Sequence, residues 1–362
     1  MPKDKVHDKA EADIPSEQKH TKQYRRENRR QANRDRSGGV RKRKHNSSTC
    51  TSSGSSPSGV YFHPITSATE FTKEHMDALH MVPVLNCPIE EVVPVSHCPE
   101  DLLHRIRPFW SASREDLYNR DFERLVPAAK EAADGPNHTS YSRLSMGTIL
   151  CLHAVMTLMH LFSGVDSDMS DPDGEVKSVS KITTTGCADS LCNEFLEGLA
   201  QLCSQTFPTW DYRPMTWDVK VLPERYNFTV RPDRVIFYAQ SKRQKTPFAW
   251  VTINPDYLAP TTDEYESTLP QIAAQTIAMA RYHPREVLGI QFSFRYVTFW
   301  RAVIPENYLE LIKGSGDLPP DVFIEMKRST VLDIEQPDGR YEFSRALLSL
   351  LMYWNEQVSG NK

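Results

Sequence analysis

Apolar positions in the first half of the chain recur every three to four residues in several stretches, which is the spacing of one face of an α-helix. The stretches with this pattern are residues 113–135, 142–162 and 190–206. Ser113 is a suitable cap for the first stretch, Pro127 is expected to kink it or end it early, and Gly135 with Pro136 is expected to stop it. The second stretch is apolar nearly all round and predicts a buried helix.

After residue 210 the pattern changes to short runs rich in β-branched and aromatic residues, which is typical of strands. The predicted strands are residues 217–221, 228–238, 248–253, 287–294, 297–303 and 322–327. A helix is predicted between the third and fourth strands, over residues 269–282, and another over residues 343–354. From residue 186 the order is helix, three strands, helix and further strands, which predicts an α/β (α+β) domain over residues 186–362.

The first 185 residues divide into three parts by composition. Residues 1–60 consist largely of charged residues, Ser and Gly, so we expect a disordered arm that buries too little apolar surface to fold. Residues 61–99 are richer in apolar residues but are interrupted by prolines, which favours an extended wrapper over regular elements. Residues 100–185 are predicted to be a helical region that ends in an acidic, turn-rich loop.

Charge is unevenly distributed, although the whole chain has a formal net charge of only -4. Residues 1–45 contain 15 Lys or Arg against 7 Asp or Glu, a net charge of +8, which leaves -12 on the remainder. The basic arm is therefore the expected contact for nucleic acid. Its densest basic cluster consists of Arg41, Lys42, Arg43 and Lys44. This cluster has the form of a nuclear-localisation patch, which predicts a nuclear protein; a solvated basic tail in the cytoplasm is the alternative.

Several classes of protein lack support in this sequence. The most apolar stretch, residues 146–162, is shorter than the roughly 20 residues that a membrane span needs, so we expect a soluble protein without a membrane partner. The 7 cysteines form no CxxC pair and are expected to stay reduced. The chain has no Walker loop, GxGxxG, GxSxG or kinase-type motif, so NTPase, dehydrogenase and hydrolase functions of those types are not indicated.

Three local motifs lie in order within the predicted α-β-β-β-α-β part. Arg231-Pro232-Asp233 precedes an apolar strand, the next strand carries Thr252 and Asn254, and the helix after it carries Gln271 and Gln275. With this order and these motifs, residues 186–305 resemble the PD-(D/E)XK nuclease-like superfamily, in the manner of divergent fungal members. The resemblance implies a restriction-endonuclease-like αβββαβ core, with the helical region and the basic arm as N-terminal extensions.

The resemblance also implies where catalytic residues would lie. In an active member, Asp233 and an acid on the third strand would hold Mg²⁺, and a lysine on that strand would assist the attacking water. Here the acid position falls on Thr252 and the lysine position on Asn254, while Gln271 takes the place of the helix glutamine. Glu194, on the first helix, would have to complete a metal site with Asp233. We therefore expect no cofactor, and Mg²⁺ only if the protein is an active endonuclease.

The leading hypothesis is a non-catalytic or degenerate nuclease-like binding or scaffold module with a nuclear, nucleic-acid-contacting arm. One alternative is an active Mg²⁺-dependent DNA endonuclease, in which Asp233 works with an unrecognised acid or with Glu325 and Lys327, a Glu-x-Lys on one face of a later strand. The other is a protein–protein interaction factor without a nucleic-acid role, because the acidic folded region suits a protein partner better than DNA.

Overall fold

The computed structural model describes residues 70–360, except 120, 137–139, 163–193, 195–197, 199–209, 214–229, 231, 240–244, 255–266, 284, 294 and 314–317. Contacts between Cα atoms divide the chain into two units, Met1–Val60 and Tyr61–Lys362. All of the described residues belong to the second unit. The predicted disordered arm, the acidic loop after residue 162 and the strand predicted over residues 217–221 lie outside the described residues.

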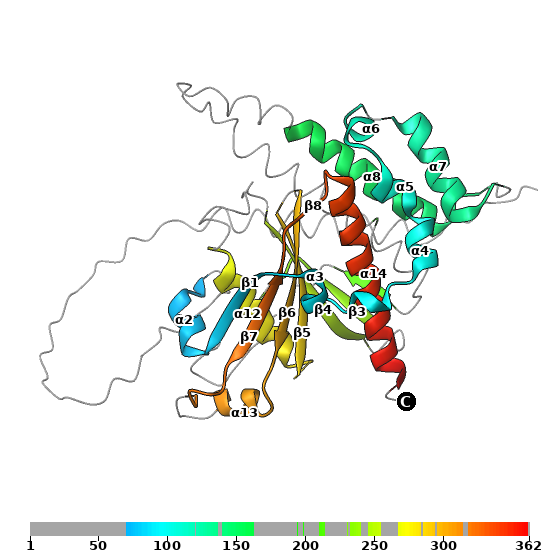
Figure 1. Cartoon of the computed structure of the whole chain (residues 1–362). Helices are drawn as coiled ribbons and strands as arrows, with labels where there is room; N and C mark the ends of the chain where they lie inside the picture. The colour runs from blue at the N-terminus through cyan, green and yellow to red at the C-terminus, as the bar shows by residue number, and fades with distance from the viewer. Residues whose placement is uncertain are drawn as a thin grey trace, which may run out of the picture. The chain divides into compact units, whose positions relative to one another are not determined.

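A mixed sheet forms the centre of the second unit (Figure 1). Its strands are β1 (Met81–Cys87), β2 (Trp210–Arg213), β3 (Arg234–Ala239), β4 (Lys245–Asn254), β5 (Glu286–Ser293), β6 (Tyr296–Val303), β7 (Ile324–Ser329) and β8 (Leu332–Asp333). Seven of them lie in the order β1-β7-β6-β5-β4-β3-β2, and the short β8 pairs with β6. The pairs β1–β7 and β4–β5 are parallel and the others are antiparallel, so the predicted mixed α/β class is confirmed.

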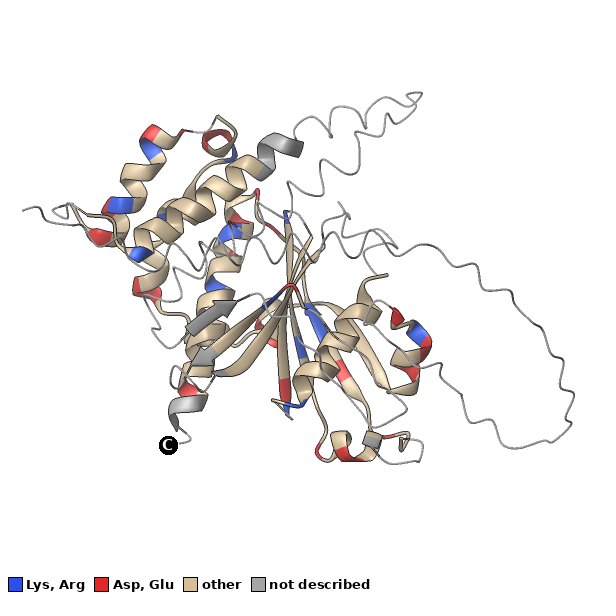
Figure 2. Cartoon of the chain, turned by 180° about the vertical axis from the view of Figure 1, so that it is seen from behind, with Lys and Arg blue, Asp and Glu red and all other residues tan. Residues whose placement is uncertain are grey.

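Helices lie on both faces of this sheet. The helices are α2 (Lys73–Ala78), α3 (Ile89–Val92), α4 (Glu100–Arg105), α5 (Arg107–Ser111), α6 (Arg114–Tyr118), α7 (Phe122–Asp134), α8 (Arg143–Phe162), α12 (Leu269–Ala280), α13 (Tyr308–Lys313) and α14 (Pro337–Gly360). α3 and α14 lie in front of the sheet in Figure 1. α12, which has no charged residue, crosses the back of the sheet, the side seen in Figure 2.

Two hydrophobic cores follow from the alternation of side chains along the central strands. On one face, Trp250 and Trp300 pack with α2, α12 and α13. On the other face, Leu288 and Ile290 pack with α14 and the helical region α4–α8. Gly289 of β5 is required opposite Trp250, its register partner on β4, because a Cβ at position 289 would lie 2.1 Å from the indole ring. The strand pair is thus held together by close approach of an indole to the backbone.

The stretch predicted as one helix over residues 113–135 is two helices. Ser113 caps α6 as predicted, because its hydroxyl accepts the backbone N–H of Asp116 at 3.0 Å. Asp121 then caps α7 by accepting the N–H of Arg124 at 3.2 Å, and Gly135 ends it with a φ of 81°. The expected early end at Pro127 is wrong, since α7 continues to Asp134. Burial of the α7 face against α8 offsets the hydrogen bond that proline cannot donate.

The expectation of an extended wrapper over residues 61–99 is wrong for the described part of that segment. Residues 70–99 form α2, β1, α3 and the 3₁₀ helix η2 (Val95–His97), and β1 joins the sheet. Pro83 is compatible with β1 because an edge strand has a neighbour on one side only, so a missing N–H need not break the ladder. Pro88, Pro94 and Pro99 are the N-cap residues of α3, η2 and α4, where a missing backbone N–H breaks no helical hydrogen bond.

Other elements agree with prediction in place and type. The predicted helices at 142–162, 269–282 and 343–354 correspond to α8, α12 and the longer α14, and the strands from 228 onward correspond to β3–β7. β2, β8 and α13 were not predicted. Within the part of the chain that the structure describes, no helix has both the length and the apolar character needed to cross a membrane.

Candidate functional site

One end of the sheet, where the central strands β4 and β5 finish, combines features that bind ligands in α/β proteins. The parallel strands β4 and β5 end there, and α12, which connects them, begins there. Ligands of open α/β sheets bind outside the carboxyl ends of parallel strands. Thr252, Gln291 and Ser293 place polar side chains at these strand ends, although central strands of this kind are usually apolar throughout.

Two adjacent sets of hydrogen bonds, together called the polar cluster, connect these strands to α12 and β6, and they meet where Thr252 and Gln291 are register partners. Its members are Thr252, Thr268, Gln275, Gln291, Thr298 and Trp300, all buried except the half-buried Thr268. The Thr252 hydroxyl donates to Oε1 of Gln275 at 2.7 Å. Oε1 of Gln291 accepts the indole N–H of Trp300 at 3.2 Å, and its Nε2 donates to the hydroxyl of Thr268 at 3.1 Å. The cluster is neutral and its side chains are fixed by one another.

Asp233 lies beside this cluster at the start of β3. Its Oδ2 accepts the backbone N–H of Ile253 at 2.7 Å, which places its carboxylate next to Thr252 across the β3–β4 pair. The structure therefore brings together Asp233 and Thr252, the two residues predicted at the metal-binding positions. One carboxylate oxygen and the threonine hydroxyl are both already engaged within the protein.

The other predicted site residues occupy different surroundings. Asn254 is the last residue of β4, and its side chain is outside the described part of the structure. Gln271 is half-buried on α12, one turn before Gln275 and on the same face. Glu194 lies against α8, where its Oε1 is 2.6 Å from Nδ1 of His153. No described contact joins Glu194 to Asp233. Residues 41–44, the predicted basic cluster, lie outside the described residues.

These residues do not fit a Mg²⁺ site. Mg²⁺ requires near-octahedral oxygen ligands, normally with carboxylates among them, and Asp233 supplies the only carboxylate for which the described residues show a contact with β4 at this end of the strand. The Thr252 hydroxyl is directed to Gln275 instead. Among the described residues, no three His, Cys, Asp or Glu side chains are grouped closely enough to hold a metal ion.

The literal Glu-x-Lys is placed far from Asp233. Glu325 and Lys327 lie on β7, which is separated from β3 by β6, β5 and β4. Nζ of Lys327 is 3.0 Å from a carboxylate oxygen of Glu91 and 3.7 Å from one of Glu325, and the contact with Glu91 raises the pKa of Lys327. The alternative that joins these residues with Asp233 in one active site is therefore wrong, and β7 is an internal strand between β1 and β6.

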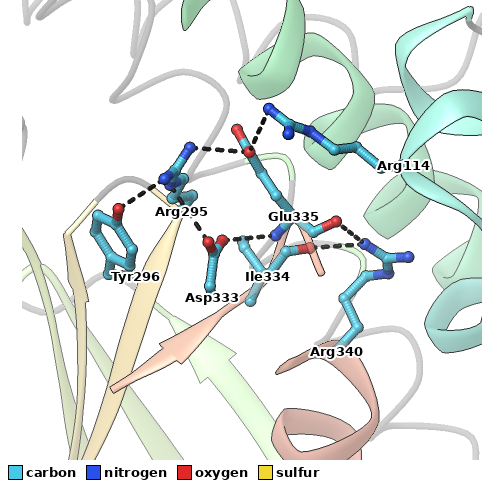
Figure 3. Close-up of polar contacts among 7 residues, drawn as sticks. All are labelled: Arg114, Arg295, Tyr296, Asp333, Ile334, Glu335 and Arg340. Carbon is cyan, nitrogen blue, oxygen red and sulfur yellow. Dashed lines mark hydrogen bonds and ion pairs between the residues drawn. The ribbon is translucent and has the colours of Figure 1, made fainter. Parts of the chain in front are cut away.

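An ion cluster lies at the same end of the sheet, around the connection between β8 and α14 (Figure 3). Arg295 contacts Glu335 at 2.9 Å and Asp333 at 3.6 Å, and Arg114 of α6 reaches Glu335 at 3.6 Å. Burial raises the pKa of Glu335 above its ordinary value, although Arg295 opposes this. Burial alone would lower the pKa of Arg295, but Asp333 and Glu335 raise it. The cluster joins the helical region to the sheet and has no unengaged carboxylate for a ligand.

Arg340 extends this connection into the core. Its side chain is completely buried and donates to the carbonyl oxygens of Phe109, Ile334 and Glu335 at 2.8–2.9 Å, and also to that of Ala112 (Figure 3 shows those to Ile334 and Glu335). Burial lowers the pKa of Arg340 to about 10, so the guanidinium remains charged at neutral pH. Arg340 therefore joins α14 to the end of α5 and acts as a structural tie.

A cleft of about 390 Å³ lies within the helical region. Its lining includes Arg107 of α5, Asp116 of α6, and Arg124, Leu125 and Glu131 of α7. Arg124 is held by Asp121 at 3.1 Å and by Asp116, and acidic and basic groups balance one another around the opening. The cleft is large enough for a small ligand but its lining does not favour a particular charge.

Sequence reasoning did not identify Gln291, Thr298 and Thr268 as parts of the polar cluster. The signal was present as polar residues at alternate positions in otherwise apolar central strands, which a buried strand carries only when they find partners. A comparison with family models finds no match to this chain, and a comparison with curated proteins finds no similar sequence. The functional argument therefore depends on the geometry above.

Proposed function

We propose that the folded unit is a non-catalytic binding or scaffold module built on a degenerate nuclease-like core. The order β2, β3, β4, α12, β5, with β2–β3–β4 antiparallel and β4–β5 parallel across α12, supports the αβββαβ core that the sequence resembles. In this proposal Asp233 is the remnant of a metal-binding pair, and Thr252, Asn254 and Gln271 occupy the other family positions.

The observation that carries the proposal is the bond between Thr252 and Gln275. A carboxylate at position 252 would be free to bind a cation, whereas the threonine hydroxyl donates to a buried amide oxygen. The neighbouring Asp233 carboxylate accepts the amide of Ile253, a role that stabilises the β3–β4 pair. Asp233 and Thr252 are thus both engaged in contacts that stabilise the fold, and together they offer one carboxylate where an active site would use two to hold the metal that generates hydroxide.

A nicking assay on supercoiled DNA tests this proposal. Wild-type protein with Mg²⁺ or Mn²⁺ is expected to cleave no more DNA than the Asp233→Ala variant purified in the same way. The double variant Thr252→Glu with Asn254→Lys restores the family residues, and calorimetry is expected to detect Mg²⁺ binding only with this variant. Metal-dependent nicking by wild type that disappears in Asp233→Ala would establish the endonuclease alternative instead.

The basic arm supplies the nucleic-acid contact in this proposal, and residues 41–44 direct the protein to the nucleus. Support comes from the charge of +8 on residues 1–45 against -12 on the remainder, because phosphate contacts depend on lysine and arginine. Alanine at residues 41–44 is expected to weaken duplex binding about tenfold or more at low salt and to flatten the dependence on salt. Equal affinity of this variant and wild type, measured by fluorescence anisotropy, would contradict the proposal.

A further inference from the structure

The sheet face that carries α3 and α14 is open where β1, β7 and β6 lie side by side. Val82 of β1 is the register partner of Glu325 of β7, and Glu325 is the partner of Val303 of β6. Register partners project from the same face of a sheet. The three side chains therefore form one row, and each is about half exposed, at 47%, 41% and 49%.

Two further apolar side chains adjoin this row. Val84 is the next residue of β1 on that face and is 36% exposed, and Phe323, two residues before Glu325, is 45% exposed. Val82, Val84, Val303 and Phe323 are four of the nine large hydrophobic residues that are exposed in the described part of the chain. Together with Glu325 they are here called the valine face. Gathered apolar side chains with a polar rim are characteristic of interaction sites.

Within the part of the chain that the structure describes, helices cover the neighbourhood of the valine face and leave its central row, Val82, Glu325 and Val303, about half exposed. α3 lies across the adjacent row, where Glu91 binds Lys327 at 3.0 Å and its carbonyl accepts from Arg301 at 3.4 Å. In Figure 1, α3 and α14 form the front layer, and the ends of β6 and β7 near α13 are drawn with no helix in front of them. The reverse side of the same strands is sealed, since Met326 and Ala302 are buried beneath helices. A sheet of this kind is normally covered by helices on both faces.

The rim of the valine face is predominantly acidic. The side chains of Glu325, Glu91 and Glu90 are 41%, 51% and 55% exposed, whereas those of Lys327 and Arg345 are 29% and 26% exposed. Each of these two cations is already bound to carboxylates, Lys327 to Glu91 and Arg345 to Glu90 and Glu342. Arg301, the third cation of the rim, is paired with Glu286. A partner therefore meets apolar side chains bordered by carboxylates that are more exposed than the cations paired with them.

We propose that the valine face binds a basic amphipathic helix of another protein. Such a helix would continue the layer formed by α3 and α14, place its apolar side chains on the valines and Phe323, and direct Lys or Arg towards Glu325 and Glu91. The partner is a protein rather than DNA, because acidic side chains repel phosphate. This inference does not depend on the nuclease-like core, since it concerns the opposite end of the sheet from Asp233.

Fluorescence anisotropy with the full chain and a labelled helical peptide of leucine, alanine and lysine tests the proposal. A matched peptide with glutamate in place of lysine measures binding that needs no basic charge. Glu325→Lys is expected to weaken binding of the lysine peptide about tenfold, and Val82→Ser with Val303→Ser by a similar factor without changing the charge of the face. Glu123→Lys, an exposed residue of α7, makes the same charge change elsewhere and is expected to bind like wild type.

Circular dichroism and unfolding midpoints establish whether each variant is folded. If Glu325→Lys does not fold, the double variant Val82→Ser with Val303→Ser still tests the proposal. If Glu325→Lys and Glu123→Lys weaken binding of the lysine peptide equally, the proposal is overturned, because the peptide then responds to the overall negative charge of the protein and not to the valine face. Unchanged binding by the serine variant would overturn it as well. A dimer of the wild-type protein that Glu325→Lys converts to a monomer would assign the valine face to a second copy of the chain instead.

Discussion

The buried hydrogen bond between Thr252 and Gln275 has a measurable energetic signature. Thr252→Val removes the donor and leaves the Oε1 of Gln275 buried without it, at an expected cost of about 1–3 kcal/mol in the free energy of unfolding. Gln275→Leu should cost a similar amount, while the double variant should lose clearly less than the sum. Urea denaturation of the four proteins measures this coupling. Strictly additive losses would show that the two side chains act independently.

The raised pKa of Glu335 predicts an unusual pH dependence. Because burial favours the protonated carboxyl in the folded state, the contribution of Glu335 is most stabilising at low pH and is lost as pH rises from about 4.5 through its folded pKa. Glu335→Gln should therefore flatten the pH dependence of the unfolding midpoint between pH 4.5 and 7. His283 titrates in the opposite sense, because burial lowers its pKa, so wild type and variant must be compared at each pH.

The matched control for Glu335 is Glu342→Gln. Glu342 is a half-exposed residue of α14 whose carboxylate lies 3.0 Å from Arg345, so its replacement removes an ion pair near the surface. Its effect on the unfolding midpoint should be small, because an ion pair near the surface contributes little to stability. An identical pH profile for wild type and Glu335→Gln would contradict the direction given for the Glu335 pKa.

Site residues were predictable only where a family motif marked them. Asp233 and Thr252 were expected together and lie together, because strand order and register follow from short turns between successive antiparallel strands. Glu194 was assigned by position on a helix face alone, and its contact with His153 depends on tertiary packing that a single sequence does not express. Gln291 and Thr298 became recognisable only when three strands and α12 were assembled around them.

Among the elements, α14 and the end of α5 are joined by the buried side chain of Arg340 in addition to their apolar contacts. Arg340→Met should cost about 3 kcal/mol or more in unfolding free energy, since the carbonyls of Phe109 and Ala112 lose their buried donor. Arg340→Lys should rescue little of this loss, because an ammonium cannot span the carbonyls that the planar guanidinium reaches. Chemical denaturation measures both. The control is Arg345→Met on the same helix, a partly exposed residue for which a change within about 1 kcal/mol is expected.

Local pattern predicted the long elements and failed for the short ones. α8, α12 and α14 are long enough for helical periodicity to be visible, and β4 to β6 are long apolar runs. β1 was missed because Pro83 within it and Pro88 after it outweighed its pattern, although its edge position tolerates Pro83. β2 and β8, with four and two residues, are too short to carry a period and are fixed by the strands that they pair with.

At the scale of the whole molecule, the described members of the two hydrophobic cores lie between Phe71 and Leu351. Removal of residues 1–60 should leave the unfolding midpoint of the remaining protein unchanged within about 2 °C, because this segment consists largely of charged residues, Ser and Gly and has little apolar surface to bury. Differential scanning calorimetry of the full and shortened chains measures this. A lowered midpoint would show that the first 60 residues contribute to the stability of the folded unit.

The parallel pair β1–β7 joins Met81 to Ile324, and Tyr308 donates its hydroxyl hydrogen to the carbonyl of Leu79 at 2.6 Å. A growing polypeptide emerges from the ribosome with its N-terminal segments first. The ribosome makes α2 and β1 long before β7, because residues 88–323 are synthesised in between. During that time the apolar side chains of Met76, Leu79 and Met81 are not yet covered by the later segments that pack on them in the folded protein. We expect nascent chains of this protein to engage chaperones at this segment, and release to follow only after β7 has left the exit tunnel.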